Sequence, residues 1–241
     1  MKIIKFKKLS GNKYELLLEN DEKIKVYEDI ILKESLLWKK EVDDIEKLLE
    51  INSKYEIEEI ALKRLSHHVE SIKGMEDYLL KKNYSREDIT NVINKLVSKG
   101  YLNDNYFAKC YISNQVNLSN DGPLKIKKYL ENHNIESNVY SELLDQYNNI
   151  WQERINKYIE KQLKLNKKSN YYFKNKMLAN LVNLGYEKEM INDSLSNITI
   201  SNQDELRKKE EEKIRIKLSR KYSGEELERK IKEKLYQKGF F

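Results

Sequence analysis

One feature recurs along this chain of 241 residues and constrains its fold more than any other. An apolar residue stands directly after Asn or Gly at the end of a helical pattern, at Tyr84, Ile135, Tyr186 and Phe240. The intervals between these positions are 51, 51 and 54 residues. Asn and Gly end helices in the left-handed conformation, and a regular interval of this length indicates repeated units. The sequence therefore predicts a tandem array of helical units.

Each unit is predicted to contain three helices. A short helix is expected after each of the first three positions, with an apolar residue five places on, at Ile89, Tyr140 and Ile191. Three short amphipathic helices bury little surface alone, so neighbouring units must share surface. We expect a mainly α fold, elongated and curved, built from three-helix units. Their predicted ranges are 54–101, 102–148 and 149–199, with a partial fourth unit of two helices at 200–241.

The first part of the chain follows a different pattern. Three segments of alternating apolar and polar residues, separated by turn residues, predict a small antiparallel β meander over Lys2–Glu28. Helical spacing follows from Asp29 to about Leu49. Because so small a sheet is not stable alone, residues 1–53 are expected to form one N-terminal part, a meander packed against a helix.

The stretch "GYLNDNYFAKCYI", residues 100–112, joins the first two helical units. Gly100 can end one helix in the left-handed conformation, and Asn103 or Asp104 can cap the next. Tyr101 and Leu102 lie between them and are apolar where a simple loop would be polar. We expect both side chains to fill the seam between the two units.

Charge is distributed unevenly along the chain, whose net charge is +6. Residues 1–60 hold 12 basic and 15 acidic residues, whereas residues 61–241 hold 34 basic and 25 acidic residues. One interpretation is a polyanionic partner for the helical part. The other is that Lys-rich helices simply present solvated faces.

Basic residues at helical spacing are the candidate contact residues. Arg154, Lys157, Lys161 and Lys164 lie at positions 0, +3, +7 and +10, which predicts four cations on one helical face. Such stripes suit a phosphate backbone or an acidic protein groove and carry little base-specific information. The whole candidate set for filament or DNA binding is Lys125, Lys127, Lys128, Arg154, Lys157, Lys161, Lys164, Arg215, Arg220 and Lys221.

Motifs for catalysis are absent from the sequence. It contains no GxxxxGK[ST] loop and no GxGxxG segment after a strand. His67 and His68 are adjacent, so they point to different sides of a helix, and Cys110 is the only cysteine. We expect no enzyme activity, no metal site and no cofactor. The sequence also lacks a signal-peptide pattern and an apolar run long enough for a membrane span, so we expect a cytoplasmic protein.

Residues 61–112 resemble the RecX family of recombinase regulators. The family pattern has a Gly-Tyr-Leu-Asp-Asp-x-x-Phe-Ala junction, and residues from Gly100 to Ala108 are in register with it, with Asn103 where Asp is usual. The segment "GPLKIKKYLENHNI", residues 122–135, resembles the family's Gly-Pro-x-x-Ile-x-x-x-Leu segment. The later units and the preceding meander are similar to the longer form of the family.

The resemblance implies a regulatory protein that binds the RecA–DNA filament along its groove. Members of the family limit filament growth and damp recombinase, ATPase and co-protease activity, which connects them to DNA repair, DNA recombination and the SOS response. The implied partners are the RecA nucleoprotein filament and single-stranded DNA, with double-stranded DNA as a further candidate, and the chain is expected to be a monomer. Tandem units fit this expectation because linked weak contacts gain through effective concentration.

Two other functions stay open at this stage. Three-helix units can contain a helix-turn-helix, so the chain could be a helical DNA-binding protein or transcription regulator that acts without a recombinase. No unit, however, shows a recognition helix rich in Arg, Asn and Gln. A structural helical adaptor is the third option, and it would affect neither nucleic acid nor a filament.

Overall fold

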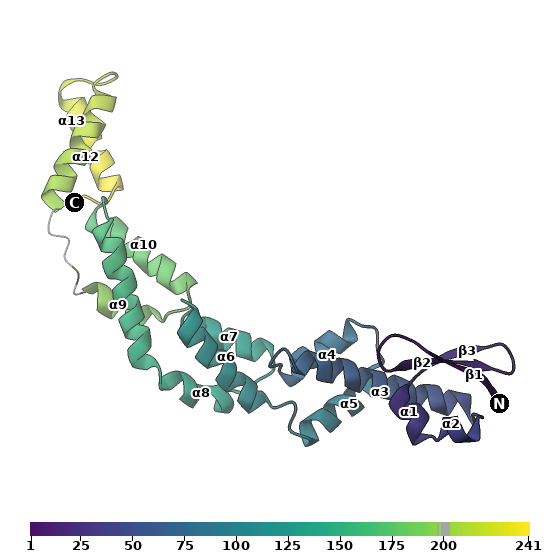
Figure 1. Ribbon diagram of the computed structural model, residues 1–241. Coiled ribbons are helices and arrows are strands. Elements are labelled where there is room, and N and C mark those ends of the chain that lie inside the picture. Colours follow the sequence, from purple (N-terminus) through teal and green to yellow (C-terminus); the bar gives the residue numbers. More distant parts are fainter. Residues whose placement is uncertain (197, 199–202) are drawn as a thin grey trace. The chain divides into compact units, whose positions relative to one another are not determined.

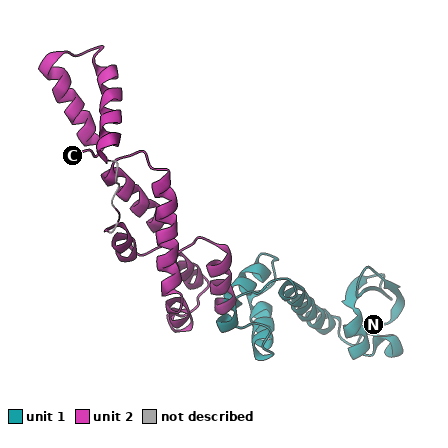
Figure 2. Cartoon of the chain, turned by 60° about the vertical axis from the view of Figure 1, so that its left-hand side comes forward, with its two compact units in different colours: residues 1–107 teal, residues 108–241 magenta. Residues whose placement is uncertain are grey.

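The structure is a computed structural model that describes residues 1–196, 198 and 203–241. The chain divides into two compact units, Met1–Phe107 and Ala108–Phe241, which Figure 2 shows in teal and magenta. The described residues form 13 helices and one sheet of three strands. The expected fold class, mainly α with a small antiparallel meander, is confirmed.

The sheet lies at the start of the first unit. Its strands are β1 (Ile3–Lys8), β2 (Lys13–Leu18) and β3 (Lys23–Tyr27), paired antiparallel in the order β1-β2-β3. Leu16 is opposite Phe6 of β1 and Ile24 of β3. Leu16, Leu18 and Val26 are fully buried. One face of the meander is therefore core, which explains the alternating sequence pattern.

The expectation of a single helix from Asp29 to about Leu49 is wrong. The structure has two short helices, α1 (Glu28–Lys33) and α2 (Leu36–Lys39), followed by the start of a long one. Ser35 and Lys40 have φ angles of +55° and +52° and so interrupt the helix. The breaks turn the chain back, and apolar side chains of α1 and α2 join the sheet's core. Burial against the sheet outweighs the local helical pattern.

The long helix α3 (Ile45–Leu65) connects the sheet to the first helical triplet. Its first half packs with the sheet through Leu48, and its second half packs with the next helices through Ile57 and Ala61. Asp44 caps it by accepting a hydrogen bond from the Lys47 amide at 3.0 Å. The boundary that we placed between residues 53 and 54 lies inside this helix.

From α3 onward the helices follow in triplets, as expected (Figure 1). Each triplet begins with its longest helix. The first triplet consists of α3, α4 (Ile72–Leu80) and α5 (Arg86–Ser98), and the second of α6 (Asp104–Leu118), α7 (Pro123–Asn132) and α8 (Ser137–Asp145). The third consists of α9 (Asn148–Lys164), α10 (Asn170–Asn183) and α11 (Lys188–Ser196). The last two helices, α12 (Gln203–Leu218) and α13 (Gly224–Gln237), form a pair.

The recurring apolar positions mark the same helix ending in every repeat. The residue before each of them has a positive φ, with angles of 64°, 57°, 88° and 74° at Asn83, Asn134, Gly185 and Gly239. At the last three positions the apolar residue then donates its amide proton five residues back, with Ile135 N–H to Leu130 O at 3.1 Å, Tyr186 to Leu181 at 3.1 Å and Phe240 to Leu235 at 3.0 Å. This is the Schellman ending, which turns the apolar residue onto the helix that it closes.

The junction after α5 is only half as expected. Gly100 has a φ of +74°, and Asn103 caps α6 by accepting from the Tyr106 amide at 3.0 Å. Asp104 instead accepts from the Ile72 amide at 2.9 Å, which ties α6 to the start of α4. Leu102 is 2% exposed, but Tyr101 is 57% exposed, so its expected burial is wrong. Neighbouring residues in an extended segment point to opposite sides, so only one of the two reaches the core.

The second unit has its core along α9 and α10. Trp151, Ile155 and Ile159 form one buried stripe on α9, and Phe173, Met177 and Leu181 form another on α10. Both stripes repeat every four residues, which places them on one side of each helix. Among the described residues, no helix combines the length and the apolar character that crossing a lipid bilayer requires.

Candidate nucleic-acid interface

The basic excess of the chain lies in the second unit. Residues 1–107 hold 20 basic and 21 acidic residues, whereas residues 108–241 hold 26 basic and 19 acidic residues. Within the second unit, residues 154–186 hold eight basic residues and a single acidic one, Glu160. This segment runs from the middle of α9 through α10. The strongest local positive charge therefore lies on the third helical triplet.

Three of the four cations expected on α9 share its exposed face. Lys157, Lys161 and Lys164 are exposed, opposite the buried stripe of the same helix. Lys157 pairs with Glu153 at 2.6 Å. Lys161 and Lys164 form no ion pair with any described residue. Two ammonium groups are thus available on the last turn of α9, with Lys157 beside them.

Arg154 does not share this face. Its guanidinium donates a hydrogen bond to the Val116 carbonyl and lies 5.2 Å from the ring centroid of Trp151. Arg154 is only partly exposed because position 154 lies next to the buried Ile155 and three residues after Trp151. The arrangement joins α9 to the end of α6. Our expectation of four cations on one face is therefore wrong for Arg154, which has a packing contact instead.

The three lysines of α7 differ in their surroundings. Lys125 pairs with Asp121 at 2.8 Å, and Lys127 lies 3.9 Å from Glu131. Lys128 is exposed and has no ion pair among the described residues. Pairs four residues apart on a helix surface contribute little stability and exchange readily with other anions. Lys128 is consequently the most accessible cation of this group.

The start of α7 packs closely on the end of α10. Gly122 donates its amide proton to Leu184 O at 2.6 Å, and Leu124 donates to Gly185 O at 2.9 Å. A Cβ atom at Gly185 would lie 2.6 Å from the Cβ of Lys125, and one at Gly122 would lie 2.5 Å from Gly185 O. Both glycines are needed for this approach. The backbone contact fixes the lysines of α7 relative to α10.

The three candidate cations of α12 and the turn that follows it also differ in whether a carboxylate neutralises them. Arg215 pairs with Glu228 and, at 3.1 Å, with Glu211, and its hydrogen bonds to Glu228 and then Glu211 raise the pKa of its guanidinium. Arg220 and Lys221 are exposed at the turn between the two helices and form no ion pair in the described part of the chain. Arg215 is therefore neutralised locally, and the other two are accessible.

Sequence reasoning missed four further cations beside the α9 group. Lys167 and Lys168 lie in the connection to α10, and Lys174 and Lys176 lie on α10. Two exposed tyrosines, Tyr171 and Tyr172, accompany them, and the Lys168 ammonium lies 5.8 Å from the ring centroid of Tyr172. The shortage of acidic residues over 154–186 could have identified these lysines from the sequence. A search for cations at regular helical spacing misses those that lie in a loop.

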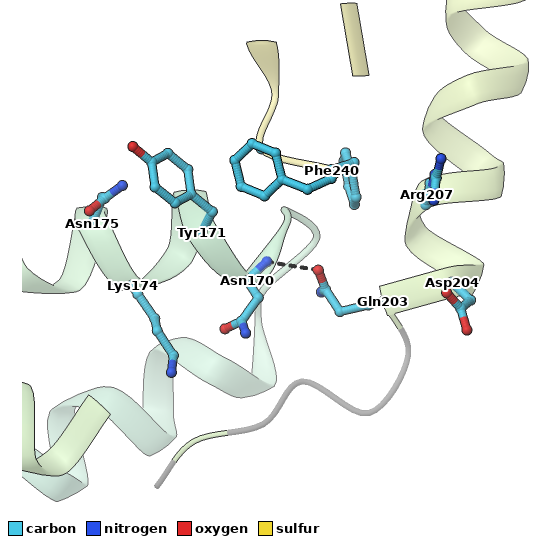
Figure 3. Close-up of a pocket in the computed structure, with 10 residues that line it drawn as sticks. Asn170, Tyr171, Lys174, Asn175, Gln203, Asp204, Arg207 and Phe240 are labelled. Atoms are coloured by element: carbon cyan, nitrogen blue, oxygen red, sulfur yellow. Dashed lines mark hydrogen bonds between the residues drawn. The ribbon is translucent and has the colours of Figure 1, made fainter. Parts of the chain in front are cut away.

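A cavity of about 570 Å³ opens at the start of α10 (Figure 3). Asn170, Tyr171, Lys174 and Asn175 come from α10, and Gln203, Asp204 and Arg207 come from α12. The Asn170 amide donates to Gln203 Oε1 at 2.8 Å. The remaining lining residues are Gly239, Phe240 and Phe241. The cavity combines aromatic rings, carboxamides and two cations in one place.

Comparison with known proteins identifies the family. No protein-family model matches the chain. It is 30% identical to the regulatory protein RecX of Bacillus subtilis over 98% of this chain and 92% of that protein, and 29% identical to the RecX of Streptococcus gordonii over 100% and 95%. A crystal structure of regulatory protein RecX has the same fold, with a TM-score of 0.62 and 18% identity over 80% of this chain and 98% of that one. The chain therefore belongs to the RecX family of regulatory proteins.

Proposed function

We propose that this protein regulates a RecA recombinase by binding the RecA–DNA filament in the cytoplasm and lowering its strand-exchange, ATPase and co-protease activity. Membership of the RecX family supports the regulatory role. The observation that supports contact with a nucleoprotein filament is the basic segment at residues 154–186, where eight cations stand against one carboxylate. Its accessible ammonium groups suit phosphates or acidic protein side chains.

The proposed contact surface contains only some of the ten candidate residues that the sequence predicts. It comprises the candidates that are exposed and have no ion pair among the described residues, joined by the lysines that lead into α10. These residues are Lys128, Lys161, Lys164, Lys167, Lys168, Arg220 and Lys221. Paired cations such as Lys157 and Lys125 add charge but must exchange a partner first. Several weak contacts along tandem repeats would act together as one stronger attachment.

The test measures ATP hydrolysis by RecA on single-stranded DNA with fewer copies of this protein than of RecA. We expect inhibition below one copy per RecA protomer. The reversal Lys161→Glu/Lys164→Glu/Lys167→Glu should weaken inhibition at least tenfold, and its effect should shrink as salt rises because the contacts are ionic. Full inhibition by this variant would reject the assigned surface.

A matched control keeps the change in net charge the same. Lys33→Glu/Lys63→Glu/Lys81→Glu reverses three exposed lysines of the first unit, two of them also in the last turn of a helix. The unfavourable interaction with the helix dipole is therefore similar in both variants. Inhibition should survive in the control. Tight binding of naked DNA by the unaltered protein without any inhibition would favour a DNA-binding regulator instead, and neither effect would favour a structural adaptor.

A further inference from the structure

We propose that the cavity between α10, α12 and the segment after α13 binds one unstacked nucleobase together with an adjoining phosphate. The occupant is a nucleotide unit of single-stranded DNA or a free nucleoside phosphate, which share this chemistry. The site goes beyond the proposed function because it requires no recombinase. It also differs from the ammonium groups of α9, which offer charge but no aromatic ring for a base to stack on.

The walls of the cavity are held by specific contacts. Ser169 is fully buried and donates its hydroxyl proton to the Lys238 carbonyl at 2.6 Å, which fixes the end of α13 against the start of α10. Gly239 follows with a φ of +74°, and a Cβ atom there would lie 2.8 Å from the Ser169 hydroxyl. The hydrogen bond from Asn170 to Gln203 fixes α12 in the same way. These contacts bring three segments distant in sequence to one site.

Aromatic rings at the cavity are unusually exposed. Tyr171 is 58% exposed and Phe241 is 69% exposed, with ring centroids 5.4 Å apart. The ring centroid of Tyr236, which is 68% exposed, lies 5.0 Å from that of Phe241. Clustered exposed aromatic side chains mark binding surfaces more often than isolated ones do. A nucleobase can stack on such rings whatever its identity.

Two buried polar atoms at the cavity have no hydrogen-bond partner among the described residues. They are Oδ1 of Asn170, an acceptor, and Nε2 of Gln203, a donor. Both residues line the cavity. Buried carboxamide atoms are rarely left without a partner, and the Watson–Crick edge of every nucleobase offers a donor and an acceptor in the plane of the ring. Because both atoms are buried, a base would meet them only after the two carboxamides turn toward the cavity.

The charges at the cavity favour an anionic ligand. Lys174 and Arg207 line it and form no ion pair with a described residue, and Asp204 is the one acidic side chain among the lining residues. Figure 3 shows Arg207 on α12, whereas the side chain of Lys174 extends from α10 away from the rings of Tyr171 and Phe240. A phosphate next to a stacked base would meet Arg207, and Lys174 would reach it by turning toward the rings. A neutral apolar ligand would leave them unused.

The test uses a single-stranded oligonucleotide that carries one 5-iodouracil. Ultraviolet irradiation should crosslink it to the full-length protein, and mass spectrometry should place the crosslink at Tyr171, Phe240 or Phe241. Replacing Tyr171 by Ala should weaken oligonucleotide binding about fivefold or more, whereas Tyr171→Phe should retain it because the ring remains. Trp38→Ala removes a ring from the first unit that is 86% exposed, more than Tyr171, and should leave binding unchanged.

Two further arms complete the experiment. Lys174→Gln/Arg207→Gln should lower the salt dependence of binding, and circular dichroism should show that the helical content of each variant is unchanged. Competition with thymidine monophosphate distinguishes the sources: displacement of the crosslink at millimolar concentration indicates a free-nucleotide site, and no displacement indicates a site for the strand. Crosslinks that map only elsewhere, with full binding by Tyr171→Ala, would overturn the proposal even if inhibition of RecA is found.

Discussion

The close approach of α7 to α10 through Gly185 leads to a quantitative prediction for Gly185→Ala. The φ of +88° at this position costs an L-residue about 1–2 kcal/mol. The new Cβ atom would also lie 2.6 Å from the Cβ of Lys125, so the two segments must separate. Separation weakens two backbone hydrogen bonds, Gly122 to Leu184 and Leu124 to Gly185, each contributing about 0.5–1.5 kcal/mol. We expect a total loss of about 2–5 kcal/mol from the free energy of unfolding.

Gly224→Ala is the matched control in the same unit. Gly224 has a φ of +57°, but a Cβ atom there meets nothing within 4 Å. This variant should therefore lose only the backbone component, about 1–2 kcal/mol. Urea denaturation followed by circular dichroism measures both losses, and the fluorescence of the buried Trp151 reports on the second unit. Equal losses in the two variants would refute the reasoning, because they would show that the contact at Gly185 contributes nothing.

Three further predictions concern individual side chains. Leu102→Ala should lower the free energy of unfolding by about 2–5 kcal/mol because it empties a buried site, whereas Tyr101→Ala should change it by less than about 0.5 kcal/mol. Urea denaturation compares the two variants. Similar losses would contradict the finding that Leu102 is buried and Tyr101 is not. Burial is the main cause that raises the pKa of Tyr111 from 10.0 to about 12, and the nearby Tyr129 and Asp121 add to it. The folded state therefore favours the protonated phenol. The stability that this preference contributes is present below pH 10 and is lost as the pH rises towards 12. Spectrophotometric titration should show one tyrosine that ionises late, and Tyr111→Phe should remove this step and reduce the loss of stability at alkaline pH. Ionisation of Tyr111 near pH 10 would contradict the assignment. Arg154→Lys should cost about 1–3 kcal/mol through the lost bond to Val116 while leaving the salt dependence of DNA binding unchanged, and a reduced salt dependence would show that Arg154 contacts phosphate after all.

Local chemistry made the helix endings predictable. The Asn or Gly before each apolar residue, as at Asn134 and Gly185, needs only its own left-handed conformation and a hydrogen bond five residues back. All of that information lies within six residues, so the repeat was visible in the sequence. The same holds for the meander, whose alternating residues and turn signals are also local. The breaks at Ser35 and Lys40 were not visible, because the sheet's core and not the local pattern decides them.

The candidate site was predictable only in part. Helical spacing placed Lys157, Lys161 and Lys164 on one face, and the structure agrees. Spacing alone could not show that Arg154 turns towards Val116, because that depends on where α6 lies. The lysines of the connection between α9 and α10 have no helical period to detect. The charge of a segment can therefore be counted from sequence, but not which of its cations are accessible.

By itself the sequence determined the class of fold, the succession of helical triplets and the residue after which the second helix of each repeat ends, because capping and amphipathic spacing act over a few neighbouring residues. Only the tertiary structure decided that Leu102 is buried and Tyr101 exposed, and that Ser169, Gln203 and Gly239 meet at one cavity. The physical reason is that burial and the pairing of polar groups depend on contacts between segments distant along the chain, which no local pattern encodes.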